Sequence, residues 1–190
     1  MNKILKTLID TGAILEGHFL LTSGRHSNKY VEKFRLIEQP ESLDFVCSSM
    51  ADLYRDKEIN VVLGAAVGGI LISGGVGQKL NVKHIFTERV NGIMELRRGF
   101  SLDKNSKVLI VEDIVTTGGS IFELIEIVKN CNAELVGITS ILDRNKEPVN
   151  FGFSYKPLVQ YPVDSWTSKD VPNWLSKIPI TKPGRSGKKK

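Results

Sequence analysis

One stretch of the chain, residues 107–130, constrains the fold more than any other. It begins with a short apolar run (KVLIVE) and, after a glycine turn, continues as an amphipathic helix over residues 119–130. Further strand-like and helix-like segments alternate at residues 60–63, 69–80, 84–87 and 135–142. This alternation predicts an α/β fold, with a central parallel sheet covered by helices on both faces. Ligands bind beyond the carboxyl ends of such strands, here after Leu63, Glu112 and Leu142.

The other segments give weaker local signals. Apolar residues at helical spacing predict helices over residues 2–11 and 41–56. Short strands are expected at residues 19–21 and 30–34, on either side of a polar turn over 22–28, and again at 158–161. Residues 88–106 form a charged segment that contains glycine. In the helix over 119–130, Phe122, Ile125 and Val128 are expected to face the core.

Length and charge exclude some classes of protein. A chain of 190 residues suits one domain, which we place at residues 1–180, followed by a basic tail over 181–190 that we expect to be disordered. The net charge of +5 could indicate a nucleic-acid binder. However, four basic residues lie in the terminal segment GRSGKKK, and the remainder is nearly balanced in charge. We therefore expect no nucleic-acid partner.

Membrane insertion and secretion are also not expected. The longest uncharged stretch, residues 61–77, is at the short limit for a membrane span and contains six glycines. The N-terminus lacks an apolar run long enough for a signal peptide. The two cysteines, Cys47 and Cys131, form no CxxC pair and are expected to be buried thiols. The cytoplasm is therefore the expected location.

The segment that carries chemistry is residues 108–120 (VLIVEDIVTTGGS). A tight turn that begins a helix is formed by Thr116, Thr117, Gly118, Gly119 and Ser120. Their backbone N–H groups and hydroxyls would converge on one point, where the helix dipole favours negative charge. The two glycines let the backbone approach a ligand closely. The turn therefore predicts a site for a terminal phosphate.

Two carboxylates, Glu112 and Asp113, precede this turn and cannot share the phosphate. Like charges about 4 Å apart repel by roughly 4 kcal/mol at an effective dielectric constant near 20. These carboxylates are better suited to accept hydrogen bonds from neutral hydroxyls, such as those of a ribose. The segment thus predicts a sugar-phosphate site. The alternative is a structural turn in which Thr117 or Ser120 caps the helix and the acids are simply exposed.

Two common nucleotide motifs are absent from the sequence. It contains no GxxxxGK[ST] phosphate loop and no GxGxxG after a strand. Residues 108–120 instead strongly resemble the phosphoribosyl diphosphate (PRPP) motif of type I phosphoribosyltransferases, and all thirteen positions match. The resemblance implies a type I fold with a small hood, formed by about residues 12–35 and part of the C-terminal region. It also implies Mg²⁺ on the diphosphate and a homodimer.

The resemblance also implies residue roles in PRPP binding. Glu112 and Asp113 would hold the ribose hydroxyls and act in catalysis. Thr116 to Ser120 would bind the 5′-phosphate, and Ile114 and Val115 lie between the two groups within the same PRPP-binding segment.

Outside this motif, the chain resembles the orotate phosphoribosyltransferases, in their shorter bacterial branch. Residues 17–30 (GHFLLTSGRHSNKY) resemble the hood segment, residues 86–100 (FTERVNGIMELRRGF) the mobile loop, and Asp143-Arg144 the pair whose arginine meets the orotate carboxylate. The orotate-binding candidates are Thr116, Arg144 and Arg25. An arginine fork suits a planar carboxylate, although Arg144 could instead pair with Glu147 at the surface. The implied reaction joins orotate to PRPP in pyrimidine biosynthesis.

The sequence departs from the longer-branch enzymes at their lysines. No Lys or His lies between His84 and Lys104, and the diphosphate loop at residues 64–69 (GAAVGG) has no lysine. The catalytic cation must then be sought among Arg89, Arg97 and Arg98, each of which could equally be a solvated hairpin residue. A phosphoribosyltransferase for adenine or xanthine, or a non-catalytic PRPP-sensing regulator, remains an alternative.

Overall fold

The main sheet is built from the central part of the chain. The computed structural model describes residues 2–183, and its larger sheet has the strand order β5-β4-β3-β6-β7-β8. These strands are β3 (Val61–Ala65), β4 (Lys83–Val90), β5 (Ile93–Leu96), β6 (Lys107–Val115), β7 (Glu134–Asp143) and β8 (Tyr155–Gln160). All neighbours pair in parallel except β5, which forms an antiparallel hairpin with β4. The predicted α/β fold with a parallel sheet is confirmed.

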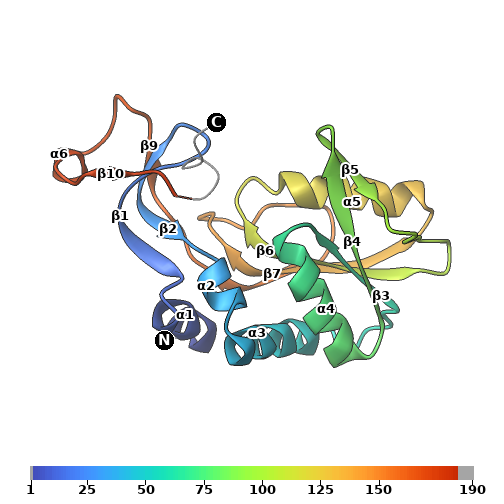
Figure 1. Ribbon diagram of the computed structural model, residues 1–190. Helices are drawn as coiled ribbons and strands as arrows, with labels where there is room; N and C mark the ends of the chain where they lie inside the picture. The colour runs from blue at the N-terminus through green and yellow to red at the C-terminus, as the bar shows by residue number, and fades with distance from the viewer. Residues whose placement is uncertain (1, 184–190) are drawn as a thin grey trace.

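Helices cover both faces of this sheet (Figure 1). One face is covered by α3 (Pro40–Asp52) and α4 (Gly68–Leu80), with α1 (Lys3–Asp10) and the short α2 (Phe34–Ile37) beside them; α5 (Gly119–Asn130) covers the other face. Successive strand residues enter opposite cores. Val62 and Leu109 pack on the α3–α4 side, whereas Leu63 and Ile110 pack on the α5 side. This double burial explains why the strands are continuously apolar.

A second sheet, which we call the hood, joins the two ends of the chain. Its order is β10-β1-β2-β9, with β1 (Ile14–Leu20), β2 (His26–Val31), β9 (Ser165–Trp166) and β10 (Ile180–Thr181). In Figure 1 the blue N-terminal strands lie beside the red C-terminal ones and α6 (Asn173–Ser176), at one end of the main sheet. β10 stands at the start of the segment expected to be a tail, and residues 184–190 of that segment lie outside the described residues.

Several local predictions differ from the structure. β2 begins at His26, inside the predicted turn, and Phe34 belongs to α2 rather than to a strand. The charged segment 88–106 contains the end of β4 and the whole of β5. Phe122 is 43% exposed because the buried face of α5 is formed by Ile121, Leu124, Ile125 and Val128, so its predicted inward position was wrong.

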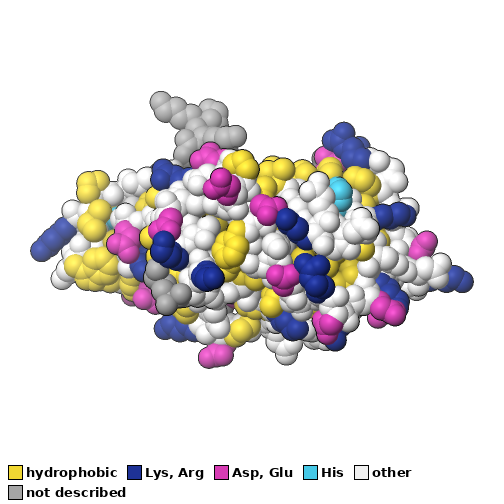
Figure 2. All heavy atoms as spheres, turned by 90° about the horizontal axis from the view of Figure 1, so that it is seen from below, with side chains coloured by type: hydrophobic (Ala, Val, Ile, Leu, Met, Phe, Trp, Pro, Cys, Tyr) yellow, Lys and Arg dark blue, Asp and Glu magenta, His cyan; other side chains and the backbone are white. Residues whose placement is uncertain are grey.

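Charges of both signs are interspersed over the surface. Figure 2 shows acidic and basic side chains mixed with apolar ones on the face seen from below, without a continuous basic stripe on that face. Among residues 2–183, no helix has both the length and the apolar character needed to cross a membrane.

Candidate functional site

The phosphate turn joins β6 to α5. β6 ends at Val115, and α5 begins at Gly119 after Gly118 adopts a left-handed φ of +77°. A Cβ at Gly118 would also lie 2.6 Å from the Phe151 ring, so a side chain is excluded both by backbone conformation and by space. Thr116 and Thr117 are exposed, which leaves their hydroxyls available to a ligand.

The start of α5 is not capped by a side chain. Its N-cap residue is Gly118, and no side-chain hydrogen bond satisfies the first N–H groups. The alternative in which Thr117 or Ser120 caps the helix is therefore wrong. Uncapped N–H groups at the positive end of a helix are suited to bind an anion such as phosphate.

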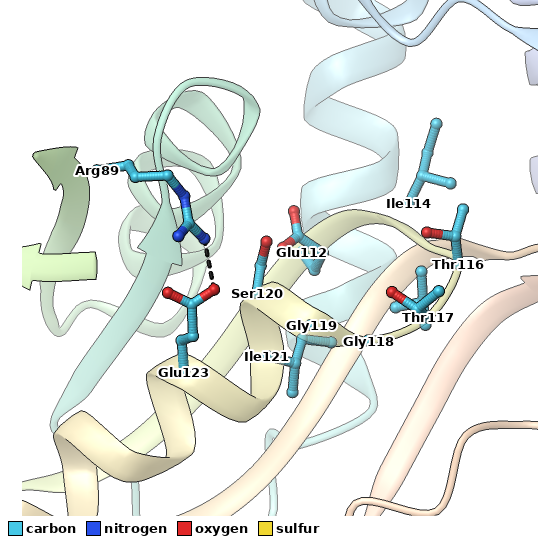
Figure 3. Close-up of a pocket in the computed structure, with 11 residues that line it drawn as sticks. Arg89, Glu112, Ile114, Thr116, Thr117, Gly118, Gly119, Ser120, Ile121 and Glu123 are labelled. Carbon is cyan, nitrogen blue, oxygen red and sulfur yellow. Dashed lines mark hydrogen bonds and ion pairs between the residues drawn. The ribbon is translucent and has the colours of Figure 1, made fainter. Parts of the chain in front are cut away.

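A cavity of about 270 Å³, which we call the phosphate cavity, lies over this turn. In Figure 3, Arg89 and Glu123 stand at one end, Thr116 and Thr117 at the other, and Glu112 between them. The cavity is lined by Arg89, Glu112, Ile114, Val115, Thr116, Thr117, Gly118, Gly119, Ser120, Ile121 and Glu123. The structure thus brings Glu112 and residues 114–120 of the predicted PRPP segment to one surface.

The acid pair is buried rather than exposed. Glu112 and Asp113 have relative exposures of 8% and 4%. The Asp113 N–H donates to Glu112 Oε1 at 3.0 Å, and the Ile114 N–H donates to Asp113 Oδ1 at 2.6 Å. Burial, followed by the charge of Asp113, raises the pKa of Glu112 to about 8. Burial thus favours the protonated form of Glu112, whereas Asp113 is the member of the pair that forms an ion pair with Lys33.

Lys33 is a residue that sequence reasoning missed. It follows β2, and its ammonium forms an ion pair with Asp113 Oδ2 from a position 80 residues earlier in the chain. Both side chains line a cavity of about 190 Å³, the acid-pair cavity, together with Ala65, Ala66, Val67, Gly68, Glu112, Ile114 and Ser120. No local motif marks Lys33, because only the contact between the hood and the main sheet brings it to the site.

A third cavity of about 460 Å³, the hood cavity, lies between the hood and the phosphate turn. Thr116 and Thr117 line both this cavity and the phosphate cavity. The other lining residues are Leu21, Thr22, Ser23, Arg25, Tyr30, Arg144, Asn145, Val163, Ser165 and Pro183. All three candidates for orotate contact, Thr116, Arg144 and Arg25, therefore line one cavity.

Arg144 is held at the end of β7 with part of its guanidinium buried. Its backbone N–H donates to Val115 O at 2.9 Å, which fixes it beside the end of β6. Among the described residues its buried Nε has no hydrogen-bond partner, and no ion pair joins it to Glu147. Burial lowers the pKa of Arg144, although the guanidinium stays charged at neutral pH. An unpaired buried donor of this kind is ready to bind a carboxylate.

Asn145, which sequence reasoning also missed, links the hood cavity to the phosphate turn. Its side-chain Nδ2 donates to Thr116 O at 2.6 Å and to Asp143 Oδ1 at 2.7 Å. The phosphate turn is thereby fixed to the end of β7, next to Arg144. The polar residue directly after the Asp-Arg pair is the only sequence signal that could have indicated this role.

The remaining arginines have other partners. Arg25 donates to Ser165 Oγ at 2.8 Å, and Arg89 donates to Gly92 O and pairs with Glu123, both at 2.5 Å. Arg98 binds Glu88 through two hydrogen bonds of 2.8 and 2.9 Å. Arg97 is exposed, and neither Arg97 nor Arg98 lines any of the three cavities. Of the three candidate catalytic arginines, only Arg89 reaches the site.

Comparison with known proteins identifies the family. Residues 35–164 match the model of the phosphoribosyl transferase domain. The orotate phosphoribosyltransferase of Caldicellulosiruptor bescii is 42% identical over 186 residues, which span 97% of this chain and 98% of that protein. The chain belongs to the orotate phosphoribosyltransferase family. The family that the sequence resemblance predicted is therefore confirmed, and its members are pentosyltransferases.

Solved structures agree with this orotate phosphoribosyltransferase fold. The Mycobacterium tuberculosis orotate phosphoribosyltransferase in complex with inorganic phosphate superimposes with a TM-score of 0.69 at 21% identity, covering 84% of this chain and 94% of that one. An adenine phosphoribosyltransferase from Trypanosoma brucei gives a TM-score of 0.64 at 21% identity, covering 83% of this chain and 79% of that one. Because proteins for different bases share the fold, the base must be argued from the site.

Proposed function

We propose that the three cavities form one active site, which transfers the phosphoribosyl group of PRPP to orotate. The bond between ribose C1 and the diphosphate oxygen breaks, and its electron pair leaves with diphosphate. A bond forms between C1 and a ring nitrogen of orotate, whose proton is released. The products are orotidine 5′-phosphate and diphosphate, in the synthesis of pyrimidine nucleotides.

The donor half of this proposal rests on the phosphate turn and the acid pair. The uncapped start of α5 suits the 5′-phosphate, and Glu112, Ile114 and Ser120 line both the phosphate cavity and the acid-pair cavity. A ribose that spans these cavities would place its hydroxyls against Glu112 and Asp113. Asp113, which is paired with Lys33, would accept hydrogen bonds from the hydroxyls, and its carboxylate would favour a ribose ring that becomes positive in the transition state.

The acceptor half rests on one observation: Arg144 lines the hood cavity, and its buried Nε has no hydrogen-bond partner among the described residues. Orotate is a planar anion, and a guanidinium can bind its carboxylate through two parallel hydrogen bonds. The Thr116 hydroxyl lines the same cavity and can contact the base. Adenine and xanthine carry no carboxylate and would leave Arg144 without this partner.

The acid pair also fits Mg²⁺ carried by the donor. Phosphoribosyltransferases generally use Mg²⁺ with PRPP, yet in residues 2–183 no group of three or more His, Cys, Asp or Glu could hold a metal ion. Mg²⁺ typically binds through one or two carboxylates plus substrate phosphates and water, and Asp113 beside a diphosphate would supply one such carboxylate. When bound, the ion would neutralise charge on the leaving diphosphate.

The β4–β5 hairpin is the proposed lid of the site. It carries Arg97 and Arg98 just beyond β5, away from the three cavities, and closure of residues 88–100 would exclude the water that hydrolyses PRPP. We also propose a homodimer, in which this hairpin reaches the neighbouring active site. The resemblance to type I enzymes and the 64% exposure of Ile93 on the hairpin support this arrangement.

A set of reactions, each lacking one component, tests the proposed function. Purified protein is mixed with orotate, PRPP and Mg²⁺, and orotate absorbance is followed with each component left out in turn. We expect orotate to disappear only when all three are present, and adenine and xanthine to remain unchanged in parallel reactions. No change with the complete orotate mixture would refute the assignment, and consumption of adenine or xanthine would instead establish a purine enzyme.

A further inference from the structure

The acid-pair cavity lies where the family resemblance places the diphosphate, but the sequence supplies no loop lysine there. It is bounded on one side by residues 65–68, at the end of β3 and the start of α4, and on the other by Glu112 and Asp113. Among the described residues that line it, Lys33 is the only one with a positive charge. A diphosphate that entered without Lys33 would face two carboxyl groups, the Ser120 hydroxyl, apolar side chains and backbone, with no positively charged side chain.

Lys33 lies close to both walls of this cavity. Its ammonium pairs with Asp113, and it lies 3.3 Å from the position that a Cβ would take at Gly68. The same Cβ would lie 1.9 Å from Asp113 Oδ2, so only glycine lets the residue 65–68 backbone approach the ion pair this closely. The Lys33 side chain is 33% exposed and lines the cavity, whereas the Asp113 side chain is only 5% exposed.

None of the three hairpin arginines, Arg89, Arg97 and Arg98, lines the acid-pair cavity. Arg89 is held by Glu123 and Gly92, and Arg98 is held by Glu88. A lysine ammonium has three N–H donors, so Lys33 can keep one hydrogen bond to Asp113 and still donate to a diphosphate oxygen. Such a contact joins unlike charges in a partly buried site, where their attraction is less screened than in bulk water.

We propose that Lys33 is a catalytic residue of this chain, whose ammonium binds the leaving diphosphate while it remains paired with Asp113. Lys33 donates hydrogen bonds and transfers no proton; it stabilises the negative charge that develops as the bond from C1 to the diphosphate oxygen breaks. The segment between β2 and α2 thus supplies the cation that the loop at residues 64–69 lacks. The inference rests on the donor half of the proposed function.

Ligand titrations with and without a diphosphate group test the role of Lys33. The probes are PRPP, Mg²⁺-diphosphate and ribose 5-phosphate, and the variant is Lys33→Met, which keeps the stem and removes the charge. We expect affinity for both diphosphate-containing probes to fall at least about tenfold, and affinity for ribose 5-phosphate to change less than about twofold. Lys33→Arg should recover part of the loss because it keeps the positive charge.

Lys107→Met is the matched control. Lys107 stands at the opposite end of β6, also pairs with a carboxylate, Glu58, and has a similar side-chain exposure of 37%. This variant should bind all three probes as the parent protein does. An equal loss of ribose 5-phosphate and PRPP binding in Lys33→Met would overturn the proposal, because Lys33 would then act only by holding Asp113. Unchanged diphosphate binding would overturn it too.

A second pair of variants covers the case in which Lys33→Met does not fold because Asp113 is left unpaired. Lys33→Met is combined with Asp113→Asn and compared with Asp113→Asn alone. A further loss of diphosphate affinity in the double variant supports direct contact, and equal affinities refute it. Failure of the orotate assay leaves these titrations interpretable, whereas failure of the parent protein to bind PRPP would refute both proposals.

Discussion

The phosphate turn and the hood cavity meet at Thr116 and Thr117, but they are built in opposite ways. The phosphate turn comes from one continuous segment in which strand, turn and helix follow within residues 107–130. The hood cavity takes residues from β1–β2, from the end of β7 and from the segment around β9. The first site depends on local backbone geometry, whereas the second exists only after distant parts of the chain have met.

This difference matches the chemistry of the two proposed ligands. A phosphate can be bound by backbone N–H groups, which any sequence with the right turn supplies. A particular base needs particular side chains, here Arg144 with Tyr30 and Arg25 around it. The family's common donor would thus be bound by the local segment, and the variable acceptor by the assembled one.

The largest effect is expected on the donor side, from Asp113→Asn. The change removes the carboxylate that pairs with Lys33 but keeps an oxygen that can accept a hydrogen bond from the Ile114 N–H, so the fold should be retained. We expect kcat/KM to fall by about 10² to 10³, because a charge that stabilises the transition state is lost. Steady-state kinetics with PRPP and orotate measure this.

Asp10→Asn is the control for this change. Asp10 also pairs with a lysine, Lys6, at 2.7 Å, but it lies on α1 away from the three cavities. Its substitution should leave turnover intact. Unchanged turnover in Asp113→Asn would show that the acid pair does not contact the ribose.

On the acceptor side, Arg144→Ala should separate the two ligands. We expect orotate affinity to fall by about 100-fold, since a charge-assisted bidentate contact is lost, while PRPP affinity changes less than about twofold. Arg25→Ala is the comparison, because Arg25 lines the same cavity but is exposed and bound to Ser165. Titration of each ligand distinguishes them. Equal losses of orotate and PRPP would mean that Arg144 supports the phosphate turn rather than the base.

Gly118→Ala probes the local geometry of the phosphate turn. A methyl group there would require a left-handed φ of +77° and would meet the Phe151 ring at 2.6 Å. We expect the free energy of unfolding to fall by about 2 kcal/mol. Gly119→Ala is the control, because its Cβ would meet only Thr117 Oγ1 at 3.7 Å. Urea unfolding of both variants decides the point, and equal stabilities would contradict the need for glycine at residue 118.

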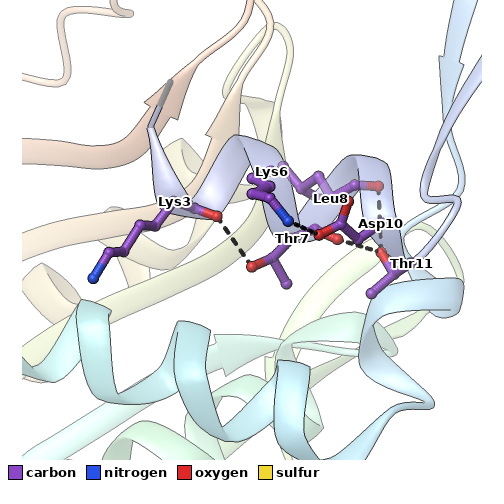
Figure 4. A network of polar contacts seen from close by, with 6 residues as sticks. All are labelled: Lys3, Lys6, Thr7, Leu8, Asp10 and Thr11. Atoms are coloured by element: carbon purple, nitrogen blue, oxygen red, sulfur yellow. Dashed lines mark hydrogen bonds and ion pairs between the residues drawn. The ribbon is translucent and has the colours of Figure 1, made fainter.

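Local segments were predicted well because their determinants are local. The helix expected at residues 2–11 is α1, Lys3–Asp10. Figure 4 shows its contacts within a single stretch, such as Lys6 with Asp10 and the Thr11 hydroxyl with Thr7 O. The strand over 107–112 and the helix over 119–130 were predicted for the same reason. The strand is specified by its continuous apolar run, and the helix by apolar residues at helical spacing.

The hood and Lys33 could not be predicted in this way. β9 and β10 have two residues each, and they exist because they pair with β2 and β1 across most of the chain. Lys33 reaches Asp113 only through that assembly. The burial of the acid pair could not be predicted either, because two adjacent carboxylates at the end of a strand are typical of an exposed position.

The smallest effect concerns this burial and its dependence on pH. The folded protein raises the pKa of Glu112 from 4.5 to about 8, so the protonated carboxyl contributes stability that is complete below pH 4.5 and is lost as the pH rises towards 8.

Glu112→Gln keeps the shape of the side chain and removes its titration. Between about pH 5 and about pH 8.5, the melting temperature of the parent protein should therefore fall by at least about 2–4 °C more than that of the variant. The Cys47 thiol, whose pKa is also raised by burial, does not interact with Glu112, so its contribution is common to both proteins and cancels in this difference. Parallel melting curves would mean that Glu112 is ionised in the folded protein, and the acid pair would then carry two charges against the single ammonium of Lys33.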